Sequence, residues 1–264
     1  MKEIGVEEFR PLLLAMLQDV HAFCGQHGIR YSLNYGTLIG ALRHGGFIPW
    51  DDDIDLMMPR PDYERFIRTY EGPYRIATSR TLEGYCFPFA KVYDPRTVIV
   101  EDVEYPSAYG AFLDIFPVDA LPDDAAQRRR MYRRKKWLDR VYDLKMVRPR
   151  AGRSLWKNWL LRCAHVALAP VSMEGVVRRM EENARCCEGR ETREAGFPAM
   201  PFRSSWMAWP VSLFESYRSV TFEGGEAQVV AEADRFLRDI FGDYMQLPPE
   251  EQRVTHHAFR LYWK

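Results

Sequence analysis

The sequence predicts a mixed α+β fold in three parts, on three observations. Over residues 1–122, segments with helical spacing of apolar residues alternate with short strand-like runs. A mainly helical segment follows at 123–205, and a short α/β segment, expected to pack back on the first part, occupies 206–264. The apolar share of 47% in 264 residues is enough for a sizeable core, so disorder is not expected. Length alone does not decide between one integrated domain and several small ones.

The first part begins with an amphipathic helix. Apolar residues recur at helical spacing through 7–27, and Gly28 ends the pattern. A strand is expected at 29–36, ended by Gly36. A short helix is expected to begin at Thr37, whose hydroxyl suits an N-cap.

An aspartate-rich strand is expected next, at about 51–58 before Pro59, and a helix over 60–70 follows it. Further strand-like runs occupy 74–79, 86–94, 97–102 and 110–122. Pro95 and Arg96 separate two of these runs, which predicts a hairpin turn.

The later elements are predicted from the same patterns. Helices are expected at 123–145, 154–169 and 173–188, a loop at 188–205, a hairpin at 217–230 and a helix at 231–241.

Composition excludes several classes of function. Lysine and arginine (37) balance aspartate and glutamate (37), so the molecule as a whole is not built to bind nucleic acid or anionic membranes, although local charge is a separate matter. Five cysteines without a CxxC pair favour reduced thiols in a cytoplasmic protein over a disulfide framework or a zinc site. The first ten residues lack the apolar core of a secretory signal. The most apolar later stretch, 155–171, contains Lys157 and Arg162 and is too short and too charged to span a bilayer.

Four aspartates crowd into five positions of "PWDDDID". Because side chains alternate along a strand, Asp51, Asp53 and Asp55 would share one face, opposite a mostly apolar face. Two carboxylates two positions apart lie about 7 Å apart at Cα, so both can reach one hard cation or a pair of cations. Mg²⁺ or Mn²⁺ would make such crowded charge tolerable. The alternative is a solvated acidic turn; an EF-hand is excluded, because Leu56 stands where that loop needs glycine.

A third acid stands in the strand expected at 110–122. Asp114 in "FLDIF" is enclosed by apolar neighbours, and a buried carboxylate is costly unless it is ligated or paired. It is predicted to complete the metal site, with a capping or salt-bridge role as the alternative. Upstream, Gly36 and Thr37 stand at a helix start, where backbone N–H groups suit a phosphate.

These residues resemble the signature of a known family. The segment "YGTLIGALRHGGFIPWDDDIDLMMPRPDYERF" is similar to that of the LicD family, which includes bacterial phosphocholine transferases and has fukutin and fukutin-related protein as distant relatives. The resemblance continues through "FAKVYDPRT", "GAFLDIFPVDALP", "TFEGGEAQVV" and "IFGDYMQLPPEEQRVTHH". It therefore covers most of the chain outside the helical middle.

The resemblance implies a nucleotidyltransferase-like core, in which helices flank a small mixed sheet, with a helical insertion and a short α/β C-terminal part. Matched by position, Gly36 and Thr37 form the turn of that superfamily. The catalytic and metal-binding acids are then Asp53, Asp55 and Asp114. The usual turn is Gly-Gly or Gly-Ser, and the Gly-Thr pair is a departure that the LicD family tends to show.

Substrate-binding roles are expected for further residues. Arg43 and Lys91 are candidates for binding phosphate oxygens, because fixed cations stabilise developing charge; the alternative for each is an ordinary surface position. Asp51 is an additional same-face acid, expected to bind substrate, and either it or Asp114 could be the general base. A choline headgroup would need an aromatic face. The aromatic residues available for it are Trp50, Tyr35, Tyr85 and Phe87.

The reaction implied is a metal-dependent transfer of a phospho-alcohol, most of all phosphocholine, from a CDP-activated donor to a hydroxyl of a cell-surface glycan or its lipid-linked precursor, releasing CMP. Two alternatives stay open. One is a nucleotidyltransferase that moves a nucleoside monophosphate from a nucleoside triphosphate and releases pyrophosphate. The other is a non-catalytic relative that binds glycan or nucleotide.

The basic run "RRRMYRRKKWLDR" and the apolar segment after it have two interpretations. One is a solvated basic face followed by a core helix, as most charge runs are. The other is a peripheral contact with the inner face of a membrane through residues 128–171. Nucleic acid is not an expected partner, because no binding module is present. His256 and His257 are expected to be structural, since adjacent strand residues face opposite ways.

Overall fold

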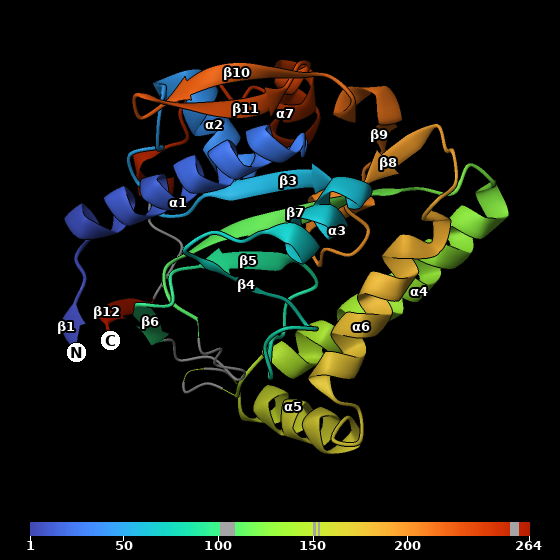
Figure 1. The fold of residues 1–264 in the computed structure, drawn as a ribbon. Helices are drawn as coiled ribbons and strands as arrows, with labels where there is room; N and C mark the ends of the chain where they lie inside the picture. Colours follow the sequence, from blue (N-terminus) through green and yellow to red (C-terminus); the bar gives the residue numbers. More distant parts are fainter. Residues whose placement is uncertain (101–108, 150–151, 153, 254–258) are drawn as a thin grey trace.

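A mixed β-sheet forms the centre of the computed structural model, which describes residues 1–100, 109–149, 152, 154–253 and 259–264. Across the sheet, its main strands are β2 (Ser32–Leu33), β3 (Asp55–Pro59), β7 (Phe112–Ala120), β5 (Ala90–Tyr93) and β4 (Arg75–Ala77) (Figure 1). Two short strands, β8 (Glu194–Gly196) and β9 (Trp209–Pro210), extend the sheet beyond the end of β7. β3 and β7 run parallel, and the other neighbours are antiparallel. The predicted mixed α+β class is confirmed.

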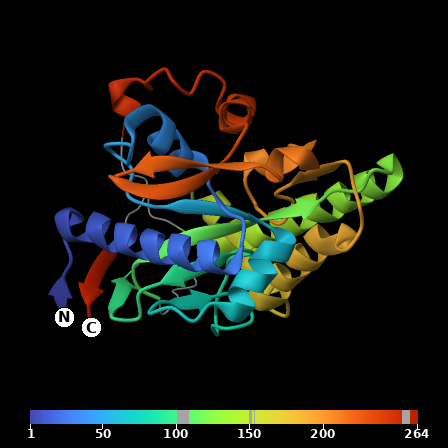
Figure 2. The same cartoon turned by 45° about the horizontal axis from the view of Figure 1, so that its top comes forward.

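Helices surround this sheet. The α-helices are α1 (Val6–His27), α2 (Tyr35–His44), α3 (Arg60–Thr69), α4 (Ala125–Met146), α5 (Leu155–Ala167), α6 (Met173–Ala184) and α7 (Ala233–Phe241). The 3₁₀ turns are η1 (Arg185–Cys187), η2 (Arg203–Trp206), η3 (Val211–Phe214) and η4 (Glu250–Gln252). α1 lies across the sheet, and α4 and α6 run side by side at one end of it (Figures 1 and 2). α5 lies at the far tip of that helical group (Figure 1).

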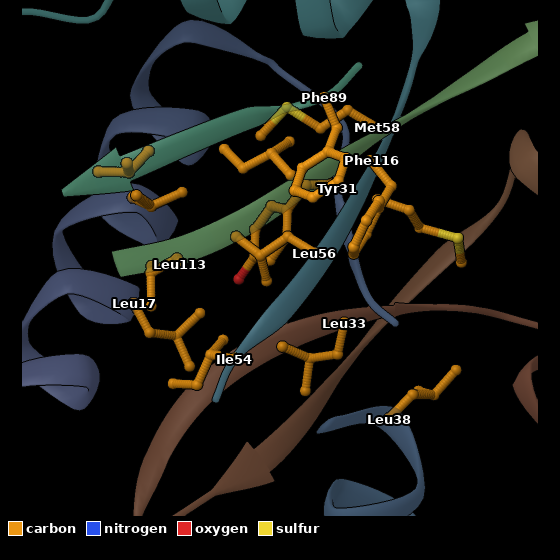
Figure 3. Close-up of a cluster of buried hydrophobic side chains, with 14 of the residues drawn as sticks. Leu17, Tyr31, Leu33, Leu38, Ile54, Leu56, Met58, Phe89, Leu113 and Phe116 are labelled. Atoms are coloured by element: carbon orange, nitrogen blue, oxygen red, sulfur yellow. The ribbon is translucent and has the colours of Figure 1, made fainter. Parts of the chain in front are cut away.

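One face of the central strands forms the core with α1. In Figure 3, Leu17 of α1 points toward Leu113 of β7 and Ile54, which precedes β3. All three side chains are fully buried. Because side chains alternate along extended chain, the next residues, Asp55 and Asp114, point to the opposite face. Packing against α1 therefore directs both acids away from this core.

A second, three-stranded sheet joins the two ends of the chain. β12 (Arg260–Trp263) lies between β1 (Lys2–Glu3) and β6 (Thr97–Val100). The N- and C-termini are consequently side by side (Figure 1).

The five cysteines are free thiols, as predicted, with Cys163 and Cys186 exposed.

The hairpin predicted at 217–230 is confirmed as β10 (Tyr217–Phe222) and β11 (Gly225–Val230). Its backbone is tied to the first part of the chain, since Val230 N donates to Ser32 Oγ (3.0 Å) and Gln228 N donates to the Tyr31 hydroxyl (3.2 Å). On this ground we propose to keep the three-part division 1–122, 123–205 and 206–264, with the last part packed back on the first.

Several expected boundaries are wrong. The strand at 29–36 has only two paired residues, and α2 begins at Tyr35 with Asn34 as its N-cap residue, because the Thr37 hydroxyl is engaged by the next strand instead. The aspartate strand starts at Asp55, and Pro59 is its last residue rather than its breaker. Proline is tolerated at this position because β2 pairs with β3 only at Leu56 and Met57. No hydrogen bond to β2 therefore needs the N–H that Pro59 lacks.

Two further expectations are corrected. The segment 188–205 is not only loop, since it contains β8 and the start of η2. The hairpin expected at Pro95 is wrong: β5 pairs with β4 and β7, while β6 pairs with β12. A tight turn does form, in which the Asp94 carboxylate accepts from the backbone and guanidinium of Arg96. It redirects the chain out of the central sheet.

Candidate active site

Two predicted acids lie side by side in the central sheet. Asp55 of β3 is in register with Asp114 of β7, and Asp114 N donates to Ile54 O (3.0 Å). The start of β3 is also held from the other side, because Asp55 N donates to Thr37 Oγ1 (2.9 Å). The predicted convergence of acids from two separate stretches of chain is therefore present for this pair.

The acids form one electrostatic group. Burial and then the charges of Asp53 and Asp114 raise the pKa of Asp55 well above its usual range. The charge of Asp51 adds to this rise, and Lys91 opposes it. Asp55 is only partly buried, and it lines a pocket that is described below. It therefore lies between the other acids and the solvent of that pocket.

Lys91 of β5 completes this group from the other side of β7. Its Nζ donates to Asp114 Oδ1 (2.5 Å), and only 3% of its surface is exposed. The same Nζ lies 3.5 Å from the ring centre of Phe112, 4.9 Å from that of Phe87 and 5.3 Å from that of Phe89. The aromatic faces stabilise the ammonium group, which has left water. The structure thus places Lys91 beside the acids rather than on the surface, with Asp114 as its partner.

The loop that carries Asp51 and the other acids lies against α1 and the first turn of α2. Arg10 of α1 donates through Nη2 to the backbone oxygens of Pro49 (2.9 Å) and Asp51 (2.8 Å). A Cβ added to Gly36 would lie 2.6 Å from Asp51 Oδ2, so only glycine lets this carboxylate come so close to the first turn of α2. The positive end of the helix dipole favours an anion at that point. Arg10 was not identified from the sequence.

Asn34, directly before α2, is a second residue that the sequence analysis missed. It is fully buried, yet neither polar atom of its amide has a hydrogen-bond partner of normal geometry, and its contact with Tyr35 is only a weak one. An unsatisfied buried amide needs an explanation, such as a bound ligand or water. Its position suits a phosphate at the N-terminus of α2, and an asparagine before a helix is an N-cap signal that could have identified it.

Arg43 is not brought to the acids. It lies in the last turn of α2, about 9 Å along the helix axis from Thr37, on a rise of 1.5 Å per residue. Its Nη1 donates to the backbone oxygens of Tyr244 (2.5 Å) and Gln246 (3.4 Å). Its guanidinium therefore holds the segment after α7 against α2, and a phosphate role would require that contact to break.

A pocket of about 860 Å³ opens beside Asp55. Its lining comes from distant parts of the chain: Tyr35, Asp55, Phe202, Ser204, Trp206, Met207, Asp239, Ile240 and Phe241. The Tyr35 hydroxyl lies 3.0 Å from Ser204 Oγ, and Asp239 Oδ2 accepts from Trp209 Nε1 (3.0 Å). Of the aromatic residues considered for a choline headgroup, Tyr35 lines this pocket, and Trp50, Tyr85 and Phe87 do not.

The donor set suits a hard divalent cation, because it consists of carboxylate oxygens, and burial together with the neighbouring acids raises the pKa of Asp55. Asp53, Asp55 and Asp114 could hold it. Among the described residues, however, no three acidic, histidine or cysteine side chains converge closely enough to form a ready metal site. Asp114 is instead paired with the ammonium group of Lys91. His256 and His257 lie outside the described residues.

The chain is similar in sequence to several known proteins. Residues 28–157 match the family model for the LicD/FKTN/FKRP nucleotidyltransferase domain. The chain is 32% identical over 273 residues to lipopolysaccharide cholinephosphotransferase LicD of Haemophilus influenzae, and the match covers 99% of each chain. Ribitol 5-phosphate transferase FKRP of Homo sapiens is 62% identical over 29 residues, which are 11% of this chain and 6% of that protein. Mannosyltransferase regulator 4 of Saccharomyces cerevisiae is 40% identical over 53 residues, 20% of this chain and 4% of that protein.

Proposed function

The chain belongs to the LicD family of transferases, and from that premise we propose that it moves a phospho-alcohol, most of all phosphocholine, from a CDP-activated donor to a hydroxyl of a cell-surface glycan or its lipid-linked precursor, releasing CMP. One observation carries the proposal. Asp55 and Asp114 are in register on parallel strands, with Lys91 next to them and a pocket of about 860 Å³ beside them.

In the proposed step, the acceptor hydroxyl attacks the phosphorus that bears the alcohol. The bond from that phosphorus to the oxygen shared with CMP breaks, and CMP leaves with the electron pair. The hydroxyl proton passes to a carboxylate of the acidic group, with Asp51 and Asp114 as the candidates. Lys91 supplies a fixed positive charge for phosphate oxygens, and the unsatisfied amide of Asn34 supplies a hydrogen-bond donor. A bound Mg²⁺ or Mn²⁺, held by Asp53, Asp55 and Asp114, would neutralise the diphosphate and acidify the hydroxyl.

The lining of the pocket supports choline as the alcohol. Aromatic rings of Tyr35, Phe202, Trp206 and Phe241 surround it, and Asp239 adds a carboxylate. Aromatic faces together with a negative charge recognise a quaternary ammonium group, whereas glycerol or ribitol would gain little from them.

A panel of donors tests the proposed function. The protein is incubated with Mg²⁺, lipopolysaccharide core oligosaccharide and either CDP-choline, CDP-ethanolamine, CDP-glycerol, CDP-ribitol or CTP. We expect CMP from CDP-choline and loss of the signal with EDTA. Pyrophosphate released from CTP would identify a nucleotidyltransferase instead. No product from any donor, even with a teichoic acid precursor as acceptor, would favour the non-catalytic interpretation.

Replacing Asp239 with asparagine should weaken the choline site selectively. The KM for CDP-choline should rise about tenfold, equivalent to about 1.4 kcal/mol, because a charge opposite the quaternary ammonium is lost. The KM for CDP-glycerol should stay the same. Asp239→Asn retains an oxygen for Trp209 Nε1, so the fold should survive. The matched control is Asp243→Asn, at an exposed position outside the pocket lining. An equal rise for both donors would remove Asp239 from headgroup recognition.

A further inference from the structure

α5 carries an apolar surface that no described part of the chain covers. The large apolar side chains exposed on it are Leu155 (88% exposed), Trp156 (61%), Trp159 (64%), Leu160 (49%) and Val166 (77%). The helix lies at the tip of the molecule farthest from β10 and α7 (Figure 1). None of the helices in the described residues is long and apolar enough to cross a membrane. This surface therefore needs another explanation.

The exposed residues form one continuous stripe. At about 100° per residue, positions 155, 156, 159, 160 and 166 fall within an arc of about 140° of the helix. The opposite side faces the protein, where Leu161 is buried and His165 Nε2 lies 2.8 Å from Leu144 O of α4. On the same reckoning, Arg162 stands about 20° beyond one edge of the apolar arc and Lys157 about 60° beyond the other. An apolar arc with tryptophans and with basic residues along both edges is typical of a helix that lies in a membrane interface.

α4 adds positive charge next to this stripe. Its exposed face carries Arg129, Arg133, Lys136 and Arg140, at spacings that align them along one side of the helix. Exposed Trp137 lies beside this basic row, and exposed Leu144 lies one turn beyond its last member. Leu144 and Arg140 also line a groove between α4 and α5, together with Leu160. The basic row and the apolar arc therefore meet at the contact of the two helices.

The same basic face reaches the candidate active site. Trp206 lines the pocket beside Asp55, and it also lines a hollow along α4 with Arg129, Arg133 and Lys136. Trp206 stacks on Tyr132 of α4, with ring centres 5.1 Å apart. A surface bound along α4 and α5 would therefore lie next to the pocket.

We propose that α5 and the exposed face of α4 dock on the surface of an anionic phospholipid bilayer, with α5 in the plane of the interface. The tryptophans and leucines of α5 enter the headgroup region, and the basic residues contact lipid phosphates. Charge complementarity selects this occupant. A second copy of the chain, docked face to face, would bring the basic edges of both helices together, which like-charge repulsion disfavours. The proposal does not depend on the transferase reaction.

Vesicle binding of the full chain tests the proposal. The protein is sedimented with vesicles of phosphatidylcholine alone, or of phosphatidylcholine with about 30% phosphatidylglycerol as the anionic lipid. We expect strong binding to the anionic vesicles only, weakened by salt. The double variant Trp156→Ala/Trp159→Ala should lower the partition coefficient at least about tenfold, because the apolar contact is lost. Trp156→Phe/Trp159→Phe is the matched control and should keep most of the binding.

A second pair of double variants tests the contribution of the basic residues to binding. Lys157→Glu/Arg162→Glu should reduce binding to anionic vesicles at least about tenfold. Arg218→Glu/Arg235→Glu changes the net charge equally but on β10 and α7, at the opposite end of the molecule, and should have little effect. Thermal melting shows whether each variant is folded. As a readout on the intact protein, brominated lipid should quench tryptophan fluorescence more in the wild type than in Trp156→Phe/Trp159→Phe.

Three results would overturn the proposal. One is equal binding of the wild type to neutral and anionic vesicles, or none to either. Another is wild-type binding by the alanine or glutamate variants of α5. The third is a dimer of the wild type that becomes a monomer in Trp156→Ala/Trp159→Ala, which would assign the apolar arc to a second copy of the chain.

Discussion

Asp55→Asn should abolish turnover while leaving the fold intact. We expect kcat to fall by about 10³-fold or more, which corresponds to about 4 kcal/mol of transition-state stabilisation. The reason is that Asp55 is in register with Asp114 and lines the pocket, so its charge faces the reacting diphosphate in the proposed function. The measurement is CMP release at saturating donor. Asp52→Asn, at the neighbouring acid outside the proposed ligand set, is the control and should keep most of the activity. An active Asp55→Asn enzyme would remove Asp55 from the site.

The same substitution should stabilise the protein when divalent cations are absent. Burial and neighbouring acids raise the folded-state pKa of Asp55 above its unfolded value, so the folded protein binds more protons between those two pKa values. The stability of the wild type should therefore fall as pH rises from about 4 through the raised pKa. Asp55→Asn removes this dependence. Thermal melts in EDTA across this range should show a higher melting temperature for the variant at neutral pH. A lower one would mean that the Asp55 carboxylate stabilises the fold.

Of the variants proposed, Lys91→Met should cause the largest loss in the free energy of unfolding. Removing one partner of a buried ion pair leaves the other charge uncompensated, which costs about 3–5 kcal/mol. Methionine fills a similar volume among the aromatic rings around Nζ, so the loss should come from Asp114 rather than from a cavity. Urea denaturation in EDTA measures this loss. Mg²⁺ or Mn²⁺ should then restore more stability to Lys91→Met than to the wild type, because Asp114 is released for a cation.

Lys135→Met is the matched control for that rescue. Lys135 of α4 is also a buried lysine with an acidic partner, Asp139, at 2.8 Å. It is remote in sequence from the proposed ligands and should lose stability without any response to divalent cations. If cations rescue both variants equally, or neither, the ion pair of Lys91 does not compete with a metal.

The sequence predicted the acidic pair because its signals are local. Alternating side chains place Asp55 and Asp114 opposite buried neighbours, whatever the rest of the fold does. The start of the aspartate strand was misjudged because strand pairing, not residue type, decides it: β2 and β7 offer partners only from Asp55 onward. The helix from 7 to 27 was predicted almost to the residue, since its pattern repeats over many turns.

The rest of the site could not be predicted, because distant segments form it. Nothing around Ser204 or Trp206 in the sequence resembles a binding motif, and Asp239 lies only beside a segment of the family signature that carries no assigned role; all three meet Asp55 only through tertiary packing. The partner of β6 likewise lies more than 150 residues away, in β12. The hydrogen bonds of Arg43 could not be predicted for the same reason, since its carbonyl acceptors come after α7.

The way the pocket is built sets an order of events during synthesis. The acidic group is complete once residue 114 has left the ribosome, whereas the pocket beside it needs Asp239, Ile240 and Phe241 from near the end of the chain. A prematurely stopped chain that contains residues 1–114 therefore has every member of the acidic group but lacks residues that line the pocket. Ribosomes stalled before α7 should carry chains without the complete pocket, and under the proposed function such chains should release no CMP.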